Sequence, residues 1–186
     1  EVANAGIGRD DVLAFWFGES DEPTPAFIRD AAVRSIDAGE TIGIVGESGS
    51  GKSTLGMAIG RLLAPNASFD GGDILVEGRS VLHCSGADLR ALRRNRLGFV
   101  FQNPMSALDP TKRIGRQIAL ALDVDRGSAA IDTLLHRAGL DDPATVAASF
   151  PHELSGGMAQ RVVIALAIAR NPAAVTADEP TASPAA

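Results

Sequence analysis

The sequence predicts an α/β fold in which short buried strands alternate with helices, and three apolar segments support it. Residues 40–46, ETIGIVG, form a short apolar run that ends in glycine, as a buried strand does. Residues 97–102, LGFVFQ, and 173–177, AAVTA, suggest two more buried strands, whereas 71–78, GGDILVEG, alternates like an exposed one. Helices are predicted where apolar residues recur at helical spacing, over 52–64, 87–95, 114–124, 128–138 and 156–170.

Composition and charge exclude several classes of protein. The chain has 186 residues with 45% hydrophobic content, enough for one domain with a core. Its net charge of -6 gives no general attraction to nucleic acid, and the basic run 89–96, LRALRRNR, suits a solvated helix face. No apolar stretch reaches the roughly 18 residues that a membrane span needs. Cys84 is the only cysteine, which excludes an intramolecular disulfide and favours a cytosolic compartment.

The strongest motif is GESGSGKS at 46–53, which fits G-x-x-x-x-G-K-[ST] between a predicted strand and a predicted helix. In such a P-loop the glycines let backbone amides point inward, and the following helix brings its positive dipole end to the same place. A polyphosphate is the natural ligand. Lys52 would reach the β and γ phosphates, and the Ser53 hydroxyl would bind Mg²⁺. The alternative is a glycine-rich turn that happens to carry a lysine.

Two adjacent carboxylates, Asp178 and Glu179, follow the predicted strand 173–177. A pair of this kind is usually solvated, but a P-loop needs an acidic residue for its metal at the end of a neighbouring strand. Asp178 is the candidate for the metal, and Glu179 for orienting or deprotonating the attacking water.

The segment LSGGM at 154–158 places a serine and two glycines at a helix start, which leaves several amides open. By itself this is a well-capped helix with Ser155 as the N-cap. Its position in the sequence, between a P-loop and an acidic strand end, indicates a role beyond capping the helix.

Taken in order, the segments GESGSGKST, VFQNP, LSGGMAQR and ADEPT resemble the Walker A motif, Q-loop, signature motif and Walker B motif of the ATP-binding subunit of ATP-binding-cassette (ABC) transporters. The resemblance covers about residues 33–182. It implies a P-loop NTPase (ABC ATPase) sheet with a helical subdomain at about 103–152. The linker VFQNPMSALDP, residues 100–110, looks most like the bacterial importers of dipeptides, oligopeptides or nickel.

The resemblance also assigns roles to individual residues. Mg²⁺ would be held by Ser53, Gln102 and, through water, Asp178, and Glu179 would be the catalytic base. The signature residues would contact the γ phosphate of the ATP bound to a second copy, because family members work as head-to-tail dimers. The residues that would bind ATP are Gly46, Glu47, Ser48, Gly49, Ser50, Gly51, Lys52, Ser53 and Thr54, and the signature residues are Leu154, Ser155, Gly156, Gly157 and Met158.

The function expected from the resemblance is ATP binding and hydrolysis as the energy-coupling subunit of an importer for peptides or similar solutes. Its partners would be a second ABC ATPase subunit, in a homo- or heterodimer, and transmembrane permease subunits. Neither nucleic acid binding nor direct membrane insertion is expected. The chain would be cytoplasmic, held at the inner membrane through the permease. The alternatives are a nucleotide-binding fragment without hydrolysis and an ABC ATPase outside transport.

The sequence departs from the family pattern at both ends. Residues 1–32 lack the expected strands, and FGESDEPTP at 17–25 resembles the N-terminal segment of class I/II aminotransferases, which predicts a chimera joined near AGET at 38–41. The alternative is a divergent N-terminus that packs its aromatic residues on the sheet. Pro184 and Ala185 stand where the family has Leu-Asp, and no histidine follows Asp178. We therefore expect an ABC ATPase domain, residues 33–186, that is incomplete at both ends and at best slow in hydrolysis.

Overall fold

The structure is a computed structural model that describes residues 43–45, 47, 49–69, 71–125 and 127–178. These residues fall into two compact units. The first runs to Leu97 and includes 173–178, and the second is Gly98–Pro172. The aminotransferase-like segment 1–32 and the tail from residue 179, with Glu179, lie outside the described residues.

The first unit begins with the segment that leads into the P-loop. Ile44 is 2% exposed, as the core residue of a buried strand should be, but residues 43–45 are not assigned to a strand. The predicted strand 40–46 is therefore not confirmed there, and its other residues are not described. Helix α2, Lys52–Ile59, is shorter than the predicted 52–64. It ends because Gly60 caps it and the next residue, Arg61, has a φ of 52°, which no α-helix continues.

A small hairpin follows α2. Strands β1, Leu75–Val76, and β2, Arg79–Ser80, pair antiparallel with Val76 opposite Arg79. The two linking residues, Glu77 and Gly78, both have positive φ, which suits the tight two-residue turn of a twisted hairpin. The strand predicted over 71–78 is thus confined to two residues. Gly72, three residues before β1, also has a positive φ, so the extended backbone of the strand does not reach back to it.

Helix α3, Gly86–Asn95, confirms the helix predicted over 87–95. Ser85 caps it by accepting a hydrogen bond from the Asp88 amide, and Leu89 and Leu92 form its buried face. At least one side chain of the basic run on this helix has partners within the protein. The Arg93 guanidinium donates to the carbonyl oxygens of Gly60 and Arg61, which ties α3 to the end of α2.

Strands β3, Leu97–Val100, and β4, Ala174–Ala177, confirm two predicted buried strands. The amides of Ala173 and Ala174 both donate to the Arg96 carbonyl, at 2.9 and 3.2 Å, so β4 begins beside the residue that precedes β3. Small residues occupy β4, and Ala174 and Thr176 are buried. Asp178 follows directly after this strand.

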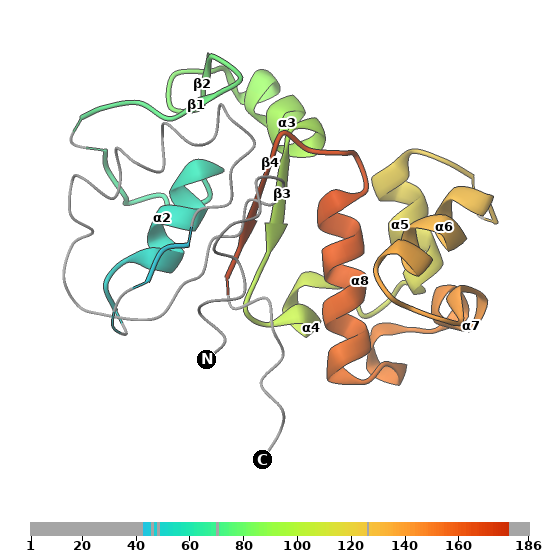
Figure 1. The fold of residues 1–186 in the computed structure, drawn as a ribbon. Helices are drawn as coiled ribbons and strands as arrows, with labels where there is room; N and C mark the ends of the chain where they lie inside the picture. The colour runs from blue at the N-terminus through green and yellow to red at the C-terminus, as the bar shows by residue number, and fades with distance from the viewer. Residues whose placement is uncertain (1–42, 46, 48, 70, 126, 179–186) are drawn as a thin grey trace. The chain divides into compact units, whose positions relative to one another are not determined.

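The second unit is mainly helical (Figure 1). Helix α4 packs against α8, and α5, α6 and α7 pack on one another, with α5 and α6 also against α8. The largest fully buried side chains here include Ile114, Ile118, Leu135 and Val162. The elements are α4 Pro104–Ala107, α5 Ile114–Leu122, α6 Ala129–Arg137, α7 Pro143–Ala148, the 3₁₀ turn η2 Pro151–Glu153, and α8 Gly156–Ile168.

Residue type explains where these helices begin and end. Ser128 and Asp142 cap α6 and α7 with side-chain oxygens, and Pro143 takes the first position of α7, where no amide is needed. Helix α5 ends where Asp123 turns to a φ of 62°. Arg170, just past α8, donates to the Ala121 carbonyl near that end. No helix in the described ranges combines the length and apolarity that crossing a membrane needs.

Candidate nucleotide-binding site

Two glycines shape the described part of the P-loop, residues 47 and 49–53. Gly49 has a φ of 82° and Gly51 a φ of 84°, values that L-amino acids with side chains adopt only at a cost. Gly51 is the N-cap of α2 and offers no side chain, so the first-turn amides of α2 lack a side-chain cap. A helix N-terminus with open amides and a positive dipole end suits an anion.

Lys52 is the buried cation of this loop, with 3% of its surface exposed. Its Nζ atom donates to the Glu47 carbonyl at 2.5 Å and to the Ser50 hydroxyl at 2.8 Å. Both partners come from the loop itself, so the ammonium is already turned into the region that the loop encloses. A buried ammonium held by neutral oxygens has no counter-charge from them, and a phosphate would supply one.

Asp178 is half-buried in the first unit, directly after β4. Its companion Glu179 is outside the described residues. Within those residues, no group of three or more His, Cys, Asp or Glu side chains is arranged to hold a metal. Mg²⁺ is usually bound by one or two protein side chains together with phosphate oxygens and water. The hydroxyl of Ser53 and the carboxylate of Asp178 are ligands of the right chemistry.

Gln102 lies in the second unit, exposed, after β3 and before Asn103. Asn103 starts α4: its side-chain oxygen accepts from the Met105 amide at 3.1 Å and its carbonyl from the Ser106 hydroxyl at 2.8 Å. Proline at the first position of α4 also favours a helix start. Gln102 is therefore attached directly to a capped helix that packs on α8.

The signature segment 154–158 is the N-terminus of α8. Ser155 caps the helix by accepting from the Met158 amide at 3.2 Å, as predicted. Gly156 and Gly157 are exposed, and a Cβ added at either would meet nothing within 4 Å. The backbone is thus accessible on the side where these side chains are missing, which suits close approach by a ligand.

A rigid entry precedes the signature. The Glu153 carboxylate accepts from the Phe150 amide at 2.7 Å, and the Glu153 amide donates to the Phe150 carbonyl at 3.0 Å, so two reciprocal hydrogen bonds close η2. The Phe150 ring stacks on His152, with centroids 5.6 Å apart, and the Arg113 guanidinium lies 4.5 Å from the Phe150 centroid. These contacts fix the direction of the backbone where it leads into Leu154.

The predicted site residues thus fall into two groups. The P-loop and Asp178 belong to the first unit, and Gln102 and the signature belong to the second. Within the described part of the P-loop, the Lys52 ammonium connects the Glu47 carbonyl and the Ser50 hydroxyl.

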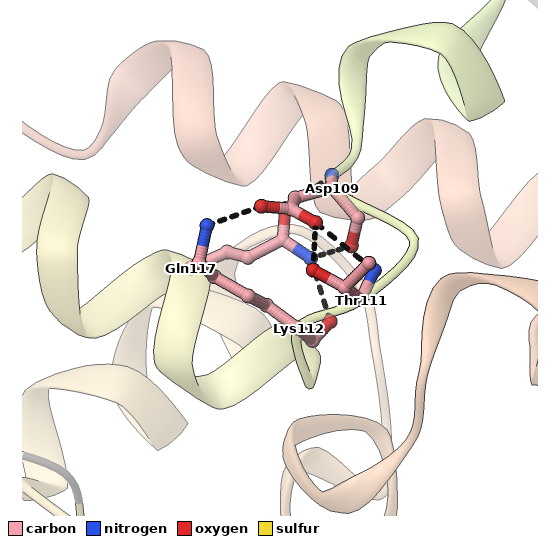
Figure 2. Close-up of polar contacts among 4 residues, drawn as sticks. All are labelled: Asp109, Thr111, Lys112 and Gln117. Carbon is pink, nitrogen blue, oxygen red and sulfur yellow. Dashed lines mark hydrogen bonds and ion pairs between the residues drawn. The ribbon is translucent and has the colours of Figure 1, made fainter.

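The structure also contains a polar cluster that the sequence did not indicate, between α4 and α5 (Figure 2). The Gln117 side chain binds backbone atoms of Asp109 and Lys112, and the Asp109 carboxylate accepts from Thr111 and Lys112. These hydrogen bonds lower the pKa of Asp109 to about 2, the Lys112 bond most and the Thr111 bonds next. The sequence signal for this turn is Asp109 itself, because an aspartate side chain often accepts a hydrogen bond from the backbone two residues later, as in an Asx turn.

Comparison with known proteins identifies the family of the chain. A family model described as ABC transporter matches residues 31–182. The chain belongs to the ABC transporter family. The match begins at the end of the segment that resembles an aminotransferase, and that second resemblance stays a prediction.

Two curated relatives of this ABC transporter chain are oligopeptide transport ATP-binding proteins named OppD. The one from Lactococcus lactis subsp. cremoris (strain SK11) is 44% identical over 153 residues, which cover 79% of this chain and 45% of that protein. The one from Bacillus subtilis (strain 168) is 44% identical over 154 residues, which cover 78% and 43%. The chain spans about half the length of the curated relatives it matches.

A solved structure with the same fold is the ATP-binding cassette MJ0796, a dimer in a post-hydrolysis state bound to ADP and Pi. It is 34% identical, with a TM-score of 0.60, and the match covers 72% of this chain and 58% of that one. A second dimeric structure of MJ0796, described as a bacterial ABC transporter cassette, has 33% identity and a TM-score of 0.59. The predicted P-loop NTPase fold of the ABC type is confirmed.

Proposed function

We propose that this chain binds ATP with Mg²⁺ and hydrolyses it as the energy-coupling ATPase of an importer for peptides or similar solutes. The observation that supports this most directly is the P-loop: a buried Lys52 faces its own glycine-shaped loop at the open N-terminus of α2. The relatives named for oligopeptide transport support the choice of solute.

Each part of the P-loop has a task in this proposal. The amides at the start of α2 and Lys52 bind the phosphates, with Lys52 exchanging its Glu47 carbonyl partner for phosphate oxygens. Ser53, Asp178 and Gln102 would hold the metal. Bound ATP–Mg²⁺ supplies the phosphoryl group and neutralises the charge that develops on it.

Glu179 orients and deprotonates the attacking water, as a carboxylate next to a metal site can. The signature residues 154–158 contact the γ phosphate on a second ATPase subunit, and the open backbone at Gly156 and Gly157 leaves room for it. Residues 103–152 act as the helical subdomain that contacts a membrane-spanning permease. Through that contact the chain works at the cytoplasmic face of the inner membrane.

The test is a titration with ATP and Mg²⁺ followed by a phosphate-release assay on the same preparation. We expect saturable binding, Mg²⁺-dependent phosphate release, and loss of both in Lys52→Ala. Binding without release above the Lys52→Ala level would favour a nucleotide-binding protein that does not hydrolyse. No binding would contradict the proposal altogether.

The importer role needs a separate experiment, because ABC ATPases outside transport also hydrolyse ATP. Co-expression with candidate peptide permease subunits, followed by purification through a tag on the permease, should recover this chain. An ATPase-active chain that co-purifies with none of them, and whose hydrolysis none of them stimulates, would point to a role outside transport.

A further inference from the structure

We propose that Gln117 is a positioning residue for Gln102: it fixes the turn 109–112 and, through that turn, the arm 102–109 that carries Gln102. The inference rests on the proposed ATPase function, in which Gln102 serves the metal. All of the residues involved lie in the second unit, so the whole path is within one compact body.

The Gln117 side chain makes three hydrogen bonds, all of them to backbone atoms. Its Oε1 accepts from the Asp109 amide at 2.9 Å, and its Nε2 donates to the carbonyl oxygens of Asp109 at 3.0 Å and Lys112 at 2.9 Å. Gln117 thus pairs with both the amide and the carbonyl of Asp109, as a neighbouring strand would. A side chain on the first turns of α5 therefore determines where residue 109 lies (Figure 2).

The Asp109 carboxylate closes the same turn from the other side. One oxygen accepts from the Thr111 amide at 2.9 Å and the Thr111 hydroxyl at 2.6 Å, and the other pairs with the Lys112 ammonium. The turn 109–112 is therefore bound both by its own aspartate and by Gln117. Either set of bonds alone would leave part of the turn free to move relative to α5.

The arm from this turn back to Gln102 is short and is held at two places. Leu108 is 3% exposed and anchors the arm beside the turn. Helix α4 follows toward the N-terminus, packs on α8, and is capped by Asn103, the neighbour of Gln102. Releasing the turn at residue 109 would let this short arm shift as a unit, and Gln102 would shift with it.

A positioning role and a purely structural one predict different kinetics. The P-loop belongs to the other unit, so loss of the Gln117 bonds leaves the ATP-binding residues intact. Misplacement of Gln102 should therefore lower kcat with little change in the affinity for ATP, because a displacement on the order of 1 Å is enough to slow a phosphoryl transfer. General destabilisation would lower the active fraction and leave the kcat of folded protein unchanged.

The experiment compares the wild-type chain with Gln117→Met, which keeps the length of the side chain but removes its hydrogen bonds. The matched control is Thr133→Val, which removes a side-chain hydrogen bond from α6 to the Ala129 carbonyl, away from the turn. For each protein, we would measure ATP–Mg²⁺ affinity, phosphate release per active site, and deuterium uptake of the peptide 99–107 with and without ATP–Mg²⁺.

For Gln117→Met we expect an ATP affinity within about twofold of wild type, a kcat lower by roughly tenfold, and loss of the protection that ATP–Mg²⁺ gives to peptide 99–107 in the wild type. Thr133→Val should behave as wild type. Should Gln117→Met fail to fold, Thr111→Val loosens the same turn more mildly and should give the same pattern at smaller size.

The inference is overturned if the variant keeps both the wild-type kcat and the nucleotide-dependent protection, or if wild-type peptide 99–107 does not respond to ATP–Mg²⁺. A wild-type chain that binds ATP without hydrolysing it contradicts the proposed function, while deuterium uptake still decides the positioning role. A chain that does not bind ATP overturns both.

Discussion

The ammonium of Lys52 lies 2.5 Å from the carbonyl oxygen of Glu47, five residues earlier in the same loop. Lys52 is 3% exposed, so there is little room around the ammonium. Geometry, and not charge alone, should therefore determine how well it binds ATP. A planar guanidinium, with its donors in a fixed fork, does not reproduce a compact ammonium in such a place.

We accordingly expect Lys52→Arg to bind ATP–Mg²⁺ roughly 10- to 100-fold more weakly than wild type, which corresponds to the 1.5–3 kcal/mol typical of a hydrogen bond to a charged group. Isothermal titration calorimetry would measure this. The matched control is Lys112→Arg, a part-exposed lysine whose partner Asp109 accepts either cation, and it should bind within about twofold of wild type. Wild-type affinity in Lys52→Arg would mean that charge alone is enough.

Ser155 should affect hydrolysis beyond its effect on stability. Ser155→Ala removes the cap of α8, which costs about 1 kcal/mol, and in our proposal it also disturbs the surface that meets the γ phosphate on a second subunit. Ser128→Ala is the matched control because it removes an equivalent cap from α6. Urea unfolding should show similar losses for both variants.

Phosphate release should separate these two serine variants, with Ser155→Ala at least several-fold slower at saturating ATP and Ser128→Ala close to wild type. Binding of ATP to the isolated chain should be the same in both, since the P-loop is untouched. Equal rates of release in the two variants would leave Ser155 with the role of a helix cap and nothing more.

The parts of the molecule that the sequence predicts well are those whose partners lie within a few residues. Ser155 and the amide of Met158, three residues later, are on the same turn, and residue type alone identifies such a cap. The P-loop is local in the same way, because the lysine partners Glu47 and Ser50 belong to the same motif. Local chemistry of this kind does not depend on the rest of the fold.

Contacts between distant segments were not predictable, for the converse reason. Arg93 read as part of a solvated basic face, yet its partners, Gly60 and Arg61, lie 33 and 32 residues away, at the end of α2. Nothing in the sequence marks Gln117, because its partners are backbone atoms that side-chain patterns do not reveal. Helix α2 was predicted too long because apolar spacing continues past Gly60, where the backbone turns away.

Gly115 of α5 lies against Ala147 of α7. A Cβ added there would lie 2.9 Å from the Ala147 carbonyl oxygen and 3.1 Å from its Cβ, and the oxygen belongs to the backbone and has little freedom to move. Gly115→Ala should therefore destabilise the chain by roughly 1–3 kcal/mol, as overpacking of a well-packed contact does. Gly86→Ala, whose nearest neighbour is a flexible arginine end at 3.6 Å, is the control.

Urea unfolding followed by circular dichroism would test this contact. The control should be neutral or slightly stabilising, because alanine is a better helix former than glycine. An equal gain in stability in Gly115→Ala would show that the two helices separate without cost. The absence of a side chain at residue 115 would then not determine the distance between α5 and α7.

The Asp109 turn should make stability depend on pH in the acid range. Hydrogen bonds from Lys112 and Thr111 lower the pKa of Asp109 from 3.8 to about 2, so the folded state favours the ionised carboxylate. A lowered pKa stabilises the fold above the unfolded-state value, and that stabilisation disappears as pH falls through the folded value. The window is therefore about pH 4 down to pH 2.

Asparagine cannot ionise. The loss of stability in Asp109→Asn relative to wild type should therefore be largest at pH 5 and should shrink as pH falls from about 4 toward 2. Urea unfolding midpoints at pH 5, 4, 3 and 2.5 would measure the difference. Thr111→Val removes one donor to the carboxylate and should reduce the pH-dependent part without abolishing it, because the Lys112 bond stays in place. A loss of stability that stays constant from pH 5 to 2.5 would mean that the shape of the asparagine side chain causes it. The ionised carboxylate would then not be what holds the turn.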